Sequence, residues 1–327
     1  MSRWFIRIFL ILFCLLAFPY PSPAPLIYRP GEGWTYETAG KEGKWQRARA
    51  KDQLDVAQKA FDKKDYSLAL KASQRVVKQW PLSDYAPKAQ YLAGRCHEEK
   101  HYDEKAFKEY QTVLEKSPKI ENYDEILKRQ YAIATRFLGG KRFRILFGYI
   151  PLFKSMDKTA DMYEKIIKNG PYSEIAPKSQ MNVGAAREKL SDYPLAVKAY
   201  ERAADRYNDR KDVAADALYK AGLAYHRQAR TSDYDQSIAG QAMATLNDFI
   251  TLYPDDARVP SAQRVITSMK TEQALGSFSV AKFYERNKRW DGALIYYNEV
   301  LLKDPESKLA TEARQRIDVL KNRAAKK

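Results

Sequence analysis

Two histidines four residues apart, with a glutamate after the first, are the residues of this sequence most suggestive of chemistry. His97, Glu98 and His101 fit the H-E-x-x-H pattern, in which both histidines bind zinc from one helical face and the glutamate acts as a general base. The pattern needs a helix through all five positions. The internal repeat of the chain ends a helix at about Glu99 and puts His101 in a turn, and Glu121, beyond the next turn, is not a convincing third ligand. We therefore expect no metal site and no cofactor.

Other kinds of catalysis have no better support. The sequence contains no G-x-S-x-G elbow, no glycine-rich phosphate loop and no dinucleotide fingerprint. Cys96 lies two residues after Gly94 in a predicted helix, a position typical of an inert core thiol. The sequence therefore predicts no catalytic residue, no enzyme activity and no small-molecule substrate.

The composition describes an ordered, basic protein. The chain has 327 residues, of which 45% are hydrophobic, and its 57 Lys+Arg against 41 Asp+Glu give a formal net charge of +16. Such a charge suits nucleic acid, anionic lipid or an acidic protein partner. Because the charge is spread along the chain without a clustered basic arm, and because the N-terminus resembles an export signal, we expect no nucleic-acid partner.

Residues 1–25 are expected to form that export signal. Two arginines precede eleven apolar residues, 8–18, which are too few to cross about 30 Å of hydrocarbon as a helix, and a proline-rich segment, 19–25, follows. Lipid attachment at Cys14 is not favoured, since Phe13 stands where a small residue would be needed. A buried N-terminal segment in a cytosolic protein is the alternative, and the sequence leaves the cleavage site open.

Residues 26–47 contain four glycines and no helical period. They are expected to form an extended leader, with Trp34 and Trp45 as candidates to pack against the first helices.

From residue 48 to 325 the chain has a helical period and an internal repeat. In a hairpin of two helices, small side chains allow close approach, a turn residue ends the second helix, and a serine two residues later can cap the next one. These serines are Ser83, Ser173 and Ser307. A fifth set, Gly222, Ala242 and Pro254, has eight extra residues between its helices. In the other four sets, small and turn residues recur twelve positions apart: Ala57, Ala69, Pro81; Gly94, Ala106, Pro118; Gly184, Ala196, Asn208; and Ala281, Ala293, Pro305.

This pattern resembles the tetratricopeptide repeat. The resemblance implies an all-α fold, a tetratricopeptide-repeat solenoid of about five to six helical hairpins over residues 48–325. Five units are clear. The sixth is split into helices near 124–138 and 155–168 by an insertion at 139–153.

The insertion is both basic and strongly apolar. One interpretation is a long loop whose Phe143, Ile145, Leu146 and Phe147 fold back onto the repeats. The other is contact with a membrane surface or a partner.

In tetratricopeptide-repeat proteins the first helix of each hairpin lines a concave groove. When the positions of this helix that face the groove are assigned in the present sequence, they predict a groove that binds an extended peptide, and in particular its C-terminal carboxylate. Cationic side chains would lie over a floor of aromatic residues and methionine. The alternative to peptide binding is that these lysines are solvated and that the aliphatic parts of their side chains cover apolar surface. The predicted groove residues are Lys51, Lys88, Tyr91, Arg95, Lys178, Met181, Tyr219 and Arg227.

The last third of the chain narrows the resemblance. Residues 249–259, 279–293 and 297–307 are similar to the closing repeats of the BamD family of outer-membrane protein assembly lipoproteins. Phe61, Tyr66, Ala69 and residues 80–83 are similar to its first repeat. That family implies a periplasmic scaffold associated with the outer membrane. Its partners would be unfolded outer-membrane β-barrel proteins and a component of the barrel-assembly machinery.

This sequence departs from the BamD pattern in its lack of a credible lipid-bearing cysteine, in the insertion at 139–153 and in its length. The alternative function is therefore an envelope adaptor that coordinates constriction or cell-wall enzymes, of the Tol-associated, cell-division type.

Overall fold

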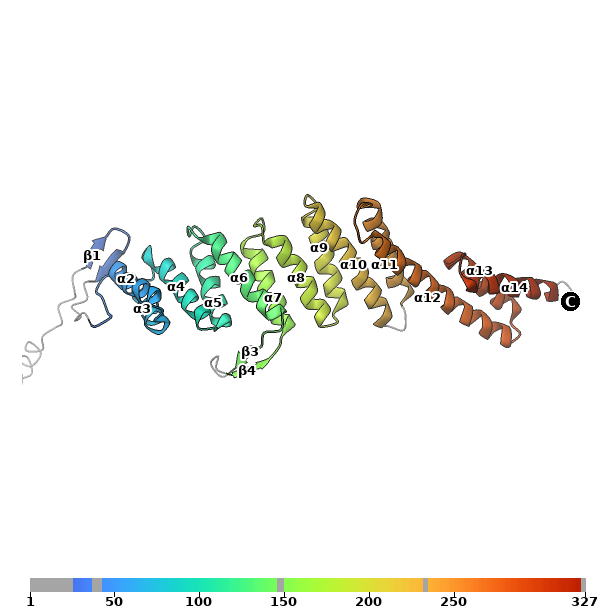
Figure 1. The fold of residues 1–327 in the computed structure, drawn as a ribbon, viewed down its shortest axis with the longest axis horizontal. Helices are drawn as coiled ribbons and strands as arrows, with labels where there is room; N and C mark the ends of the chain where they lie inside the picture. The colour runs from blue at the N-terminus through green and yellow to red at the C-terminus, as the bar shows by residue number, and fades with distance from the viewer. Residues whose placement is uncertain (1–25, 37–42, 146–149, 232–234, 325–327) are drawn as a thin grey trace, which may run out of the picture. The chain divides into compact units, whose positions relative to one another are not determined.

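The computed structural model describes residues 26–36, 43–145, 150–231 and 235–324 (Figure 1). Antiparallel helices dominate this part of the chain, and the predicted all-α tetratricopeptide-repeat fold is confirmed. The helices of the described residues are α2 Ala50–Asp62, α3 Tyr66–Gln79, α4 Tyr85–Glu99, α5 Asp103–Lys116, α6 Tyr123–Leu138, α7 Met156–Asn169, α8 Ala176–Lys189, α9 Tyr193–Arg206, α10 Lys211–Thr231, α11 Gln236–Leu252, α12 Val259–Arg286, α13 Trp290–Lys303 and α14 Lys308–Ala324.

Consecutive helices pair as the repeat predicts, from α2/α3 to α12/α13, with α14 as a final helix. The split unit pairs α6 with α7, because Tyr131 and Thr135 of α6 both contact Tyr163 of α7. The insertion therefore lengthens the connection inside one hairpin and leaves the pairing of its helices intact.

The small residues of the repeat make room for aromatic rings. A Cβ atom added to Gly94 would lie 2.4 Å from the Tyr110 ring, and one added to Gly184 would lie 2.4 Å from the Tyr200 ring. Both distances are far below van der Waals contact, so only glycine fits at these two positions. Each ring comes from the second helix, four residues after the alanine of the pattern. The spacing of the small residues predicts the close approach of the helices but not the ring that fills the space.

The turns inside four hairpins share a strained residue that is not glycine. Lys64, His101, Ser191 and Lys288 have φ values of +58° to +62°, and each lies five residues before the alanine of the second helix. A left-handed backbone at this point lets the chain reverse within three residues. No residue type in the sequence marks it.

The structure consists of two compact units, with the boundary inside α6 between Ile126 and Leu127. In the first unit, the interior of the first two hairpins is built mainly from alanines with a few larger residues. Val76 of α3 and Trp80, which directly follows that helix, pack against Ala50 of α2 and Ala89 of α4. The first helices of the two hairpins are thereby brought side by side.

In the second unit, α12 serves two hairpins. Its first half packs Ala262, Ile266 and Met269 against α10 and α11, and its second half packs Phe278 and Ala281 against α13 and α14. The sequence predicted only the second of these roles. At 28 residues, α12 continues through the position where the repeat spacing would place a turn.

Two short hairpins of strands accompany the helices. In the leader, β1 Leu26–Arg29 pairs antiparallel with β2 Gly33–Tyr36, so this part is a paired hairpin where a single extended segment was expected. Trp45 packs against the first helices, whereas Trp34 is 67% exposed and does not. The export signal assigned to 1–25 lies outside the described residues.

In the insertion, β3 Phe143–Ile145 pairs with β4 Ile150–Phe153. Phe143 is buried, and its ring stacks on Phe137 of α6 with centroids 4.1 Å apart. The interpretation in which the insertion folds back is therefore confirmed for Phe143. Leu146 and Phe147 lie outside the described residues.

The serines after the turns were expected to cap the helices that follow, and only one of the three does so. Ser83 and Ser173 each donate a hydrogen bond back to the carbonyl three residues earlier, over 3.0 and 2.7 Å, and so close the turn. Ser307 does the same, and its hydroxyl also accepts the Ala310 N–H at 3.1 Å, so it alone of the three caps the following helix. Within the ranges that the model describes, none of the helices has the length and apolar character needed to cross a bilayer.

Candidate functional site

The eight predicted groove residues divide equally between the two units. Lys51, Lys88, Tyr91 and Arg95 belong to the first unit, and Lys178, Met181, Tyr219 and Arg227 belong to the second. The two sets are described separately.

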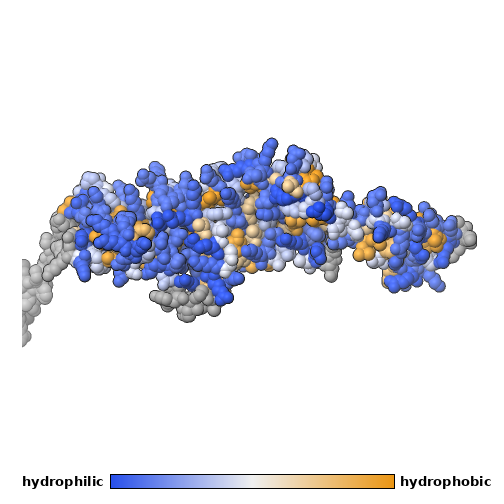
Figure 2. Space-filling model, in the orientation of Figure 1, coloured by the Kyte–Doolittle hydropathy of each residue, from blue (hydrophilic) through white to orange (hydrophobic). Residues whose placement is uncertain are grey.

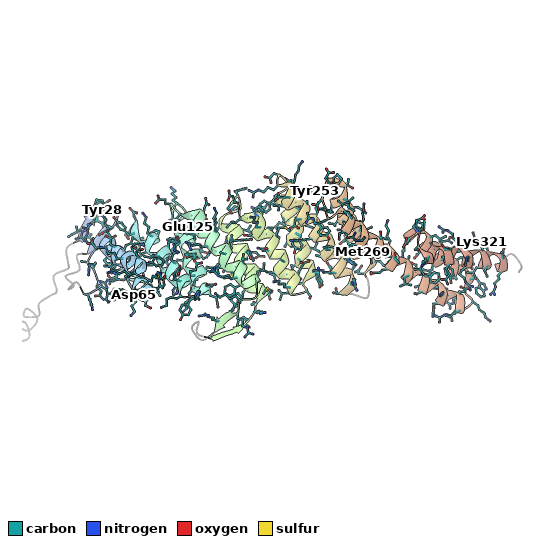
Figure 3. All side chains as sticks on the ribbon, in the orientation of Figure 1. Tyr28, Asp65, Glu125, Tyr253, Met269 and Lys321 are labelled. Atoms are coloured by element: carbon teal, nitrogen blue, oxygen red, sulfur yellow. The ribbon has the colours of Figure 1, made fainter. Side chains whose placement is uncertain are left out.

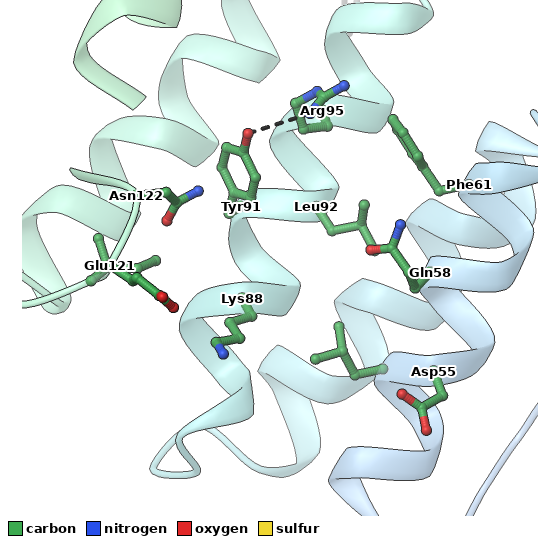
Figure 4. A pocket seen from close by; sticks show the side chains of 11 residues that line it. Asp55, Gln58, Phe61, Lys88, Tyr91, Leu92, Arg95, Glu121 and Asn122 are labelled. Carbon is green, nitrogen blue, oxygen red and sulfur yellow. Dashed lines mark hydrogen bonds between the residues drawn. The ribbon is translucent and has the colours of Figure 1, made fainter. Parts of the chain in front are cut away.

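Three residues of the first set line a cavity of about 390 Å³ between α2 and α4 (Figure 4). The remaining wall is the turn that precedes α6. Because successive first helices lie side by side, the faces of α2 and α4 that turn away from their hairpin partners form the two sides. The side chains lining the cavity include the apolar Leu54, Phe61, Leu92 and Ile120, the cationic Lys88 and Arg95, and the acidic Asp55 and Glu121.

Arg95 is the most constrained charged group of this cavity. Its Nη1 donates a hydrogen bond to Tyr91 Oη over 3.4 Å, and its guanidinium carbon lies 5.2 Å from the centroid of the Phe61 ring. Tyr91 Oη in turn donates to Glu125 Oε1 at 2.7 Å. Arg95 Nε is buried and has no hydrogen-bond partner in the described part of the chain. A buried donor without a partner is destabilising, so an acceptor that reached this nitrogen would stabilise the arrangement.

Lys88 supplies a second positive charge at the edge of the same cavity. It is exposed, and no ion-pair partner is found for it among the residues that the model describes. Lys88 and Arg95 are separated by seven residues of α4, which corresponds to roughly 10 Å along the helix axis. Lys51 does not line the cavity. Its side chain is exposed, and its backbone N–H donates to Glu32 Oε1 at 3.5 Å.

In the second unit the predicted residues have other roles. Met181 is only 8% exposed and packs in the core against α9 and α10, so its predicted place on the groove floor is wrong. Tyr219 is half-buried, and the Arg258 guanidinium covers its ring at 5.2 Å. Arg227 forms an ion pair with Glu188 at 3.1 Å. Lys178 is exposed on α8.

A second, ionic cavity of about 690 Å³ lies between α12, α13 and α14 and was not predicted. Lys282 pairs with Glu312 at 3.3 Å, and Arg316 pairs with Glu285. The Arg323 guanidinium lies over the Trp290 ring. The groove register stopped at α10 in the sequence analysis. Lys282 follows Ala281 as Arg95 follows Gly94, so carrying the register to α12 would have pointed to Lys282.

The H-E-x-x-H pattern does not form a continuous helical site. As predicted, α4 ends at Glu99, and His101 lies in the turn with a positive φ of 59°. His97 is buried, with Nε2 3.9 Å from Glu109 Oε1, and burial lowers the pKa of His97 to about 4. In the described ranges, no cluster of three or more His, Cys, Asp or Glu side chains has an arrangement that could hold a metal ion.

Cys96 is fully buried between the first two hairpins, where it contacts Ala60 and Ala69. Burial raises the pKa of its thiol to about 12, which keeps it protonated at neutral pH. The predicted inert core thiol is confirmed.

Comparison with known proteins gives a family match in the C-terminal half. A family model described as an outer membrane lipoprotein, YfiO, matches residues 153–313. The outer membrane protein assembly factor BamD of Caulobacter vibrioides is 23% identical over 145 residues, which are 44% of this chain and 47% of that protein. The match therefore spans about half the length of this relative. The cavity between α2 and α4 lies outside the residues that the family model covers.

Solved structures of repeat proteins resemble the chain over a longer span. The C-terminal part of a tetratricopeptide-repeat protein from Cytophaga hutchinsonii is 16% identical, with a TM-score of 0.35, and the alignment covers 81% of this chain and 87% of that one. A tetratricopeptide-repeat protein from Parabacteroides merdae is 14% identical, with a TM-score of 0.34 and coverage of 83% and 98%. The helical hairpins themselves and the family match lead to one conclusion: the chain is a tetratricopeptide-repeat protein that resembles the BamD outer-membrane assembly lipoproteins.

Proposed function

We propose that this protein is a periplasmic scaffold of outer-membrane protein assembly, located at the outer membrane, and that it binds unfolded β-barrel proteins and a component of the assembly machinery. The resemblance of residues 153–313 to an outer membrane lipoprotein family supports the general role. The name of the Caulobacter relative, an assembly factor, supports the same process. Protein binding, without catalysis, is the activity that such a scaffold performs.

The cavity between α2 and α4 is proposed as the site for an extended segment of the unfolded protein. An extended chain advances about 3.3 Å per residue, so roughly three residues bridge Lys88 and Arg95. An aromatic or aliphatic side chain of the segment packs against Phe61, Leu54 and Leu92, and a carboxylate pairs with a cation. The observation that carries this proposal is that Lys88 and Arg95 line the same cavity as the apolar side chains of Leu54, Phe61 and Leu92.

Peptide binding tests the proposed site. The probe is a ten-residue peptide of alternating apolar and polar residues that ends in phenylalanine with a free carboxylate, and its affinity is measured by fluorescence anisotropy. Lys88→Glu and Arg95→Gln are each expected to weaken binding by roughly tenfold, which is about 1.4 kcal/mol. Lys165→Glu, at an exposed site of α7 in the second unit and outside the predicted groove, is the matched control for Lys88→Glu and should leave the affinity unchanged. Equal affinity of all four proteins, or equal affinity for the C-terminally amidated peptide, would contradict this site.

Affinity capture from solubilised envelope tests the general role against the alternative. Using the full chain as bait, we expect a β-barrel protein with periplasmic domains among the captured partners. Recovery of cell-wall enzymes or Tol-type components without a barrel protein would instead support the envelope-adaptor function.

A further inference from the structure

The β1–β2 hairpin presents an exposed apolar face. Tyr28 of β1 lies opposite Trp34 of β2, with ring centroids 5.4 Å apart. Because side chains alternate along a strand, Leu26 lies on the same face as Tyr28. Leu26, Tyr28 and Trp34 are 50%, 58% and 67% exposed. Single exposed apolar residues are common on protein surfaces, but three neighbours on one hairpin face call for an explanation.

The turn of this hairpin is anchored to the first unit. The Glu32 side chain is almost completely buried, and its Oε1 lies 3.6 Å from Arg49 Nε. The Gly31 carbonyl accepts the Asp84 N–H at 2.9 Å, and the backbone of Gly31 packs against the Tyr85 ring. The aromatic face is therefore held in a fixed place on the repeats. Figure 3 labels Tyr28 on this hairpin, beside the start of α2.

The sequence around the hairpin is basic and, on its N-terminal side, strongly apolar. Residues 43–51, which lead into α2, contain Lys44, Arg47, Arg49 and Lys51 and no acidic residue. Only seven residues, 19–25, separate the eleven apolar residues 8–18 from Leu26 in the sequence. The face seen in Figure 2 is mostly hydrophilic, with separate apolar patches.

We propose that the face formed by Leu26, Tyr28 and Trp34 docks on a lipid surface that carries anionic headgroups. Tyrosine and tryptophan rings favour the boundary between headgroups and acyl chains, because one end of the ring is apolar and the other is polar. Lys44 and Lys51, which are exposed and follow the hairpin in the sequence, supply positive charge that is attracted to anionic lipid.

A peptide strand is the competing occupant, and the hairpin is less suited to it. Each strand has four residues, so an added strand would gain only a few backbone hydrogen bonds along either edge. A flat lipid surface requires no such edge. It contacts the side-chain face that is exposed.

The test follows the emission of Trp34 in the full chain. Residues 8–18 could hold the chain on vesicles by themselves, so the readout must be local to the hairpin. Vesicles of phosphatidylethanolamine and phosphatidylglycerol are prepared with and without bromine near the top of the acyl chains, and the emission of the Trp34→Phe variant is subtracted. We expect brominated lipid to quench the Trp34 component and Tyr28→Ser to weaken that quenching severalfold. Tyr172→Ser, at a site 91% exposed in the second unit, is the control and should have no effect.

Equal Trp34 emission on brominated and unbrominated vesicles, with the chain bound, would overturn the proposal. Protection of Trp34 by an unfolded β-barrel peptide but not by vesicles would also overturn it, in favour of a protein partner. In case Trp34→Phe disturbs the hairpin, a second measurement uses Leu26→Cys with an environment-sensitive dye in a Cys14→Ser chain, since Cys96 is buried. A blue shift on vesicles is expected, and no shift contradicts lipid contact.

Discussion

Tyr200 Oη donates a hydrogen bond to Glu188 Oε2 at 3.1 Å, from the second helix of a hairpin back to the end of the first. The same bond, with the same separation of twelve residues, joins Tyr110 to Glu98 at 2.9 Å and Tyr297 to Glu285 at 2.8 Å. Each of the three tyrosine side chains is fully buried. Three hairpins thus combine a small residue, a ring that fills the space above it and a carboxylate that binds the ring hydroxyl.

Removing one of these hydroxyls should weaken the hairpin without creating a large cavity. Tyr200→Phe leaves the ring in place and removes the hydrogen bond to Glu188, which keeps its ion pair with Arg227. A hydrogen bond to a charged group contributes about 1.5–3 kcal/mol to stability. Because Glu188 is partly exposed where it pairs with Arg227, we expect Tyr200→Phe to lower the free energy of unfolding by only about 1 kcal/mol. Urea unfolding followed by circular dichroism measures the loss. Tyr172→Phe at an exposed site should leave the free energy of unfolding unchanged, and an equal loss in both variants would contradict the assignment.

The glycines of the repeat should differ in their tolerance of alanine. Gly184→Ala would bring a methyl group into the Tyr200 ring and should lower the free energy of unfolding by about 1–3 kcal/mol. Gly240→Ala in α11 is the matched control, since an added Cβ there meets nothing within 4 Å. Alanine has the higher helix propensity, so this variant should be stabilised by up to about 1 kcal/mol. Opposite signs in the two thermal unfolding curves are the expected result. Two destabilised variants would show that the ring contact is not the cause.

The repeat made most of the helical fold predictable, because each hairpin needs small residues where its helices cross. The spacing from Gly94 to Ala106 and from Gly184 to Ala196 placed the α4/α5 and α8/α9 hairpins before any coordinate was known. The split unit was found for the same reason. The length of α12 could not be predicted, because Gly276, near the place where the repeat spacing would end the helix, lies inside it as an ordinary helical residue.

The candidate site was predictable only in part. Lys88, Tyr91 and Arg95 follow from the groove register, since the first helices of the first two hairpins lie side by side. Phe61 served as a marker of the repeat, and its position under Arg95 depends on side-chain packing that the register does not specify. Met181 was misplaced because a flexible apolar side chain at a groove position can turn into the core.

His97 should make stability depend on pH. Its pKa of about 4 in the folded protein lies below the ordinary value of 6.5, because burial and the charges of Lys105 and Lys100 disfavour its protonated form. Between these two values the unfolded chain binds more protons than the folded one, so stability should fall as the pH falls from about 6.5 to 4, by at most about 1.4 kcal/mol per unit.

The comparison of the wild-type protein with His97→Gln isolates this effect. Burial raises the pKa of the neighbouring Glu109, which favours the folded state at low pH and therefore opposes the trend from His97. The difference between the two stability profiles removes the Glu109 contribution that both proteins share. A difference that stays constant between pH 7 and pH 4 would contradict the buried, neutral histidine.

Arg258 should resist replacement by lysine, because one planar guanidinium makes several contacts at once. It donates to both carboxylate oxygens of Asp256, to Asp216 Oδ1 at 2.6 Å, and lies over the rings of Tyr219 and Phe249. Hydrogen bonds from Arg258 lower the pKa of Asp256 to about 2, so the stabilisation is present above the ordinary value of 3.8 and is lost as the pH falls toward 2.

A lysine cannot donate in this forked geometry or stack on two rings. Arg258→Lys should therefore lower the free energy of unfolding by about 1 kcal/mol at pH 7, and the Asp256 pKa, followed by NMR, should rise toward its ordinary value. Arg202→Lys, at an exposed position of α9, serves as the control and should leave both quantities unchanged. If the pKa of Asp256 stays near 2 in Arg258→Lys, a positive charge alone is enough to lower that pKa. The forked hydrogen bonds of Arg258 would then not be what holds α10 against the turn before α12.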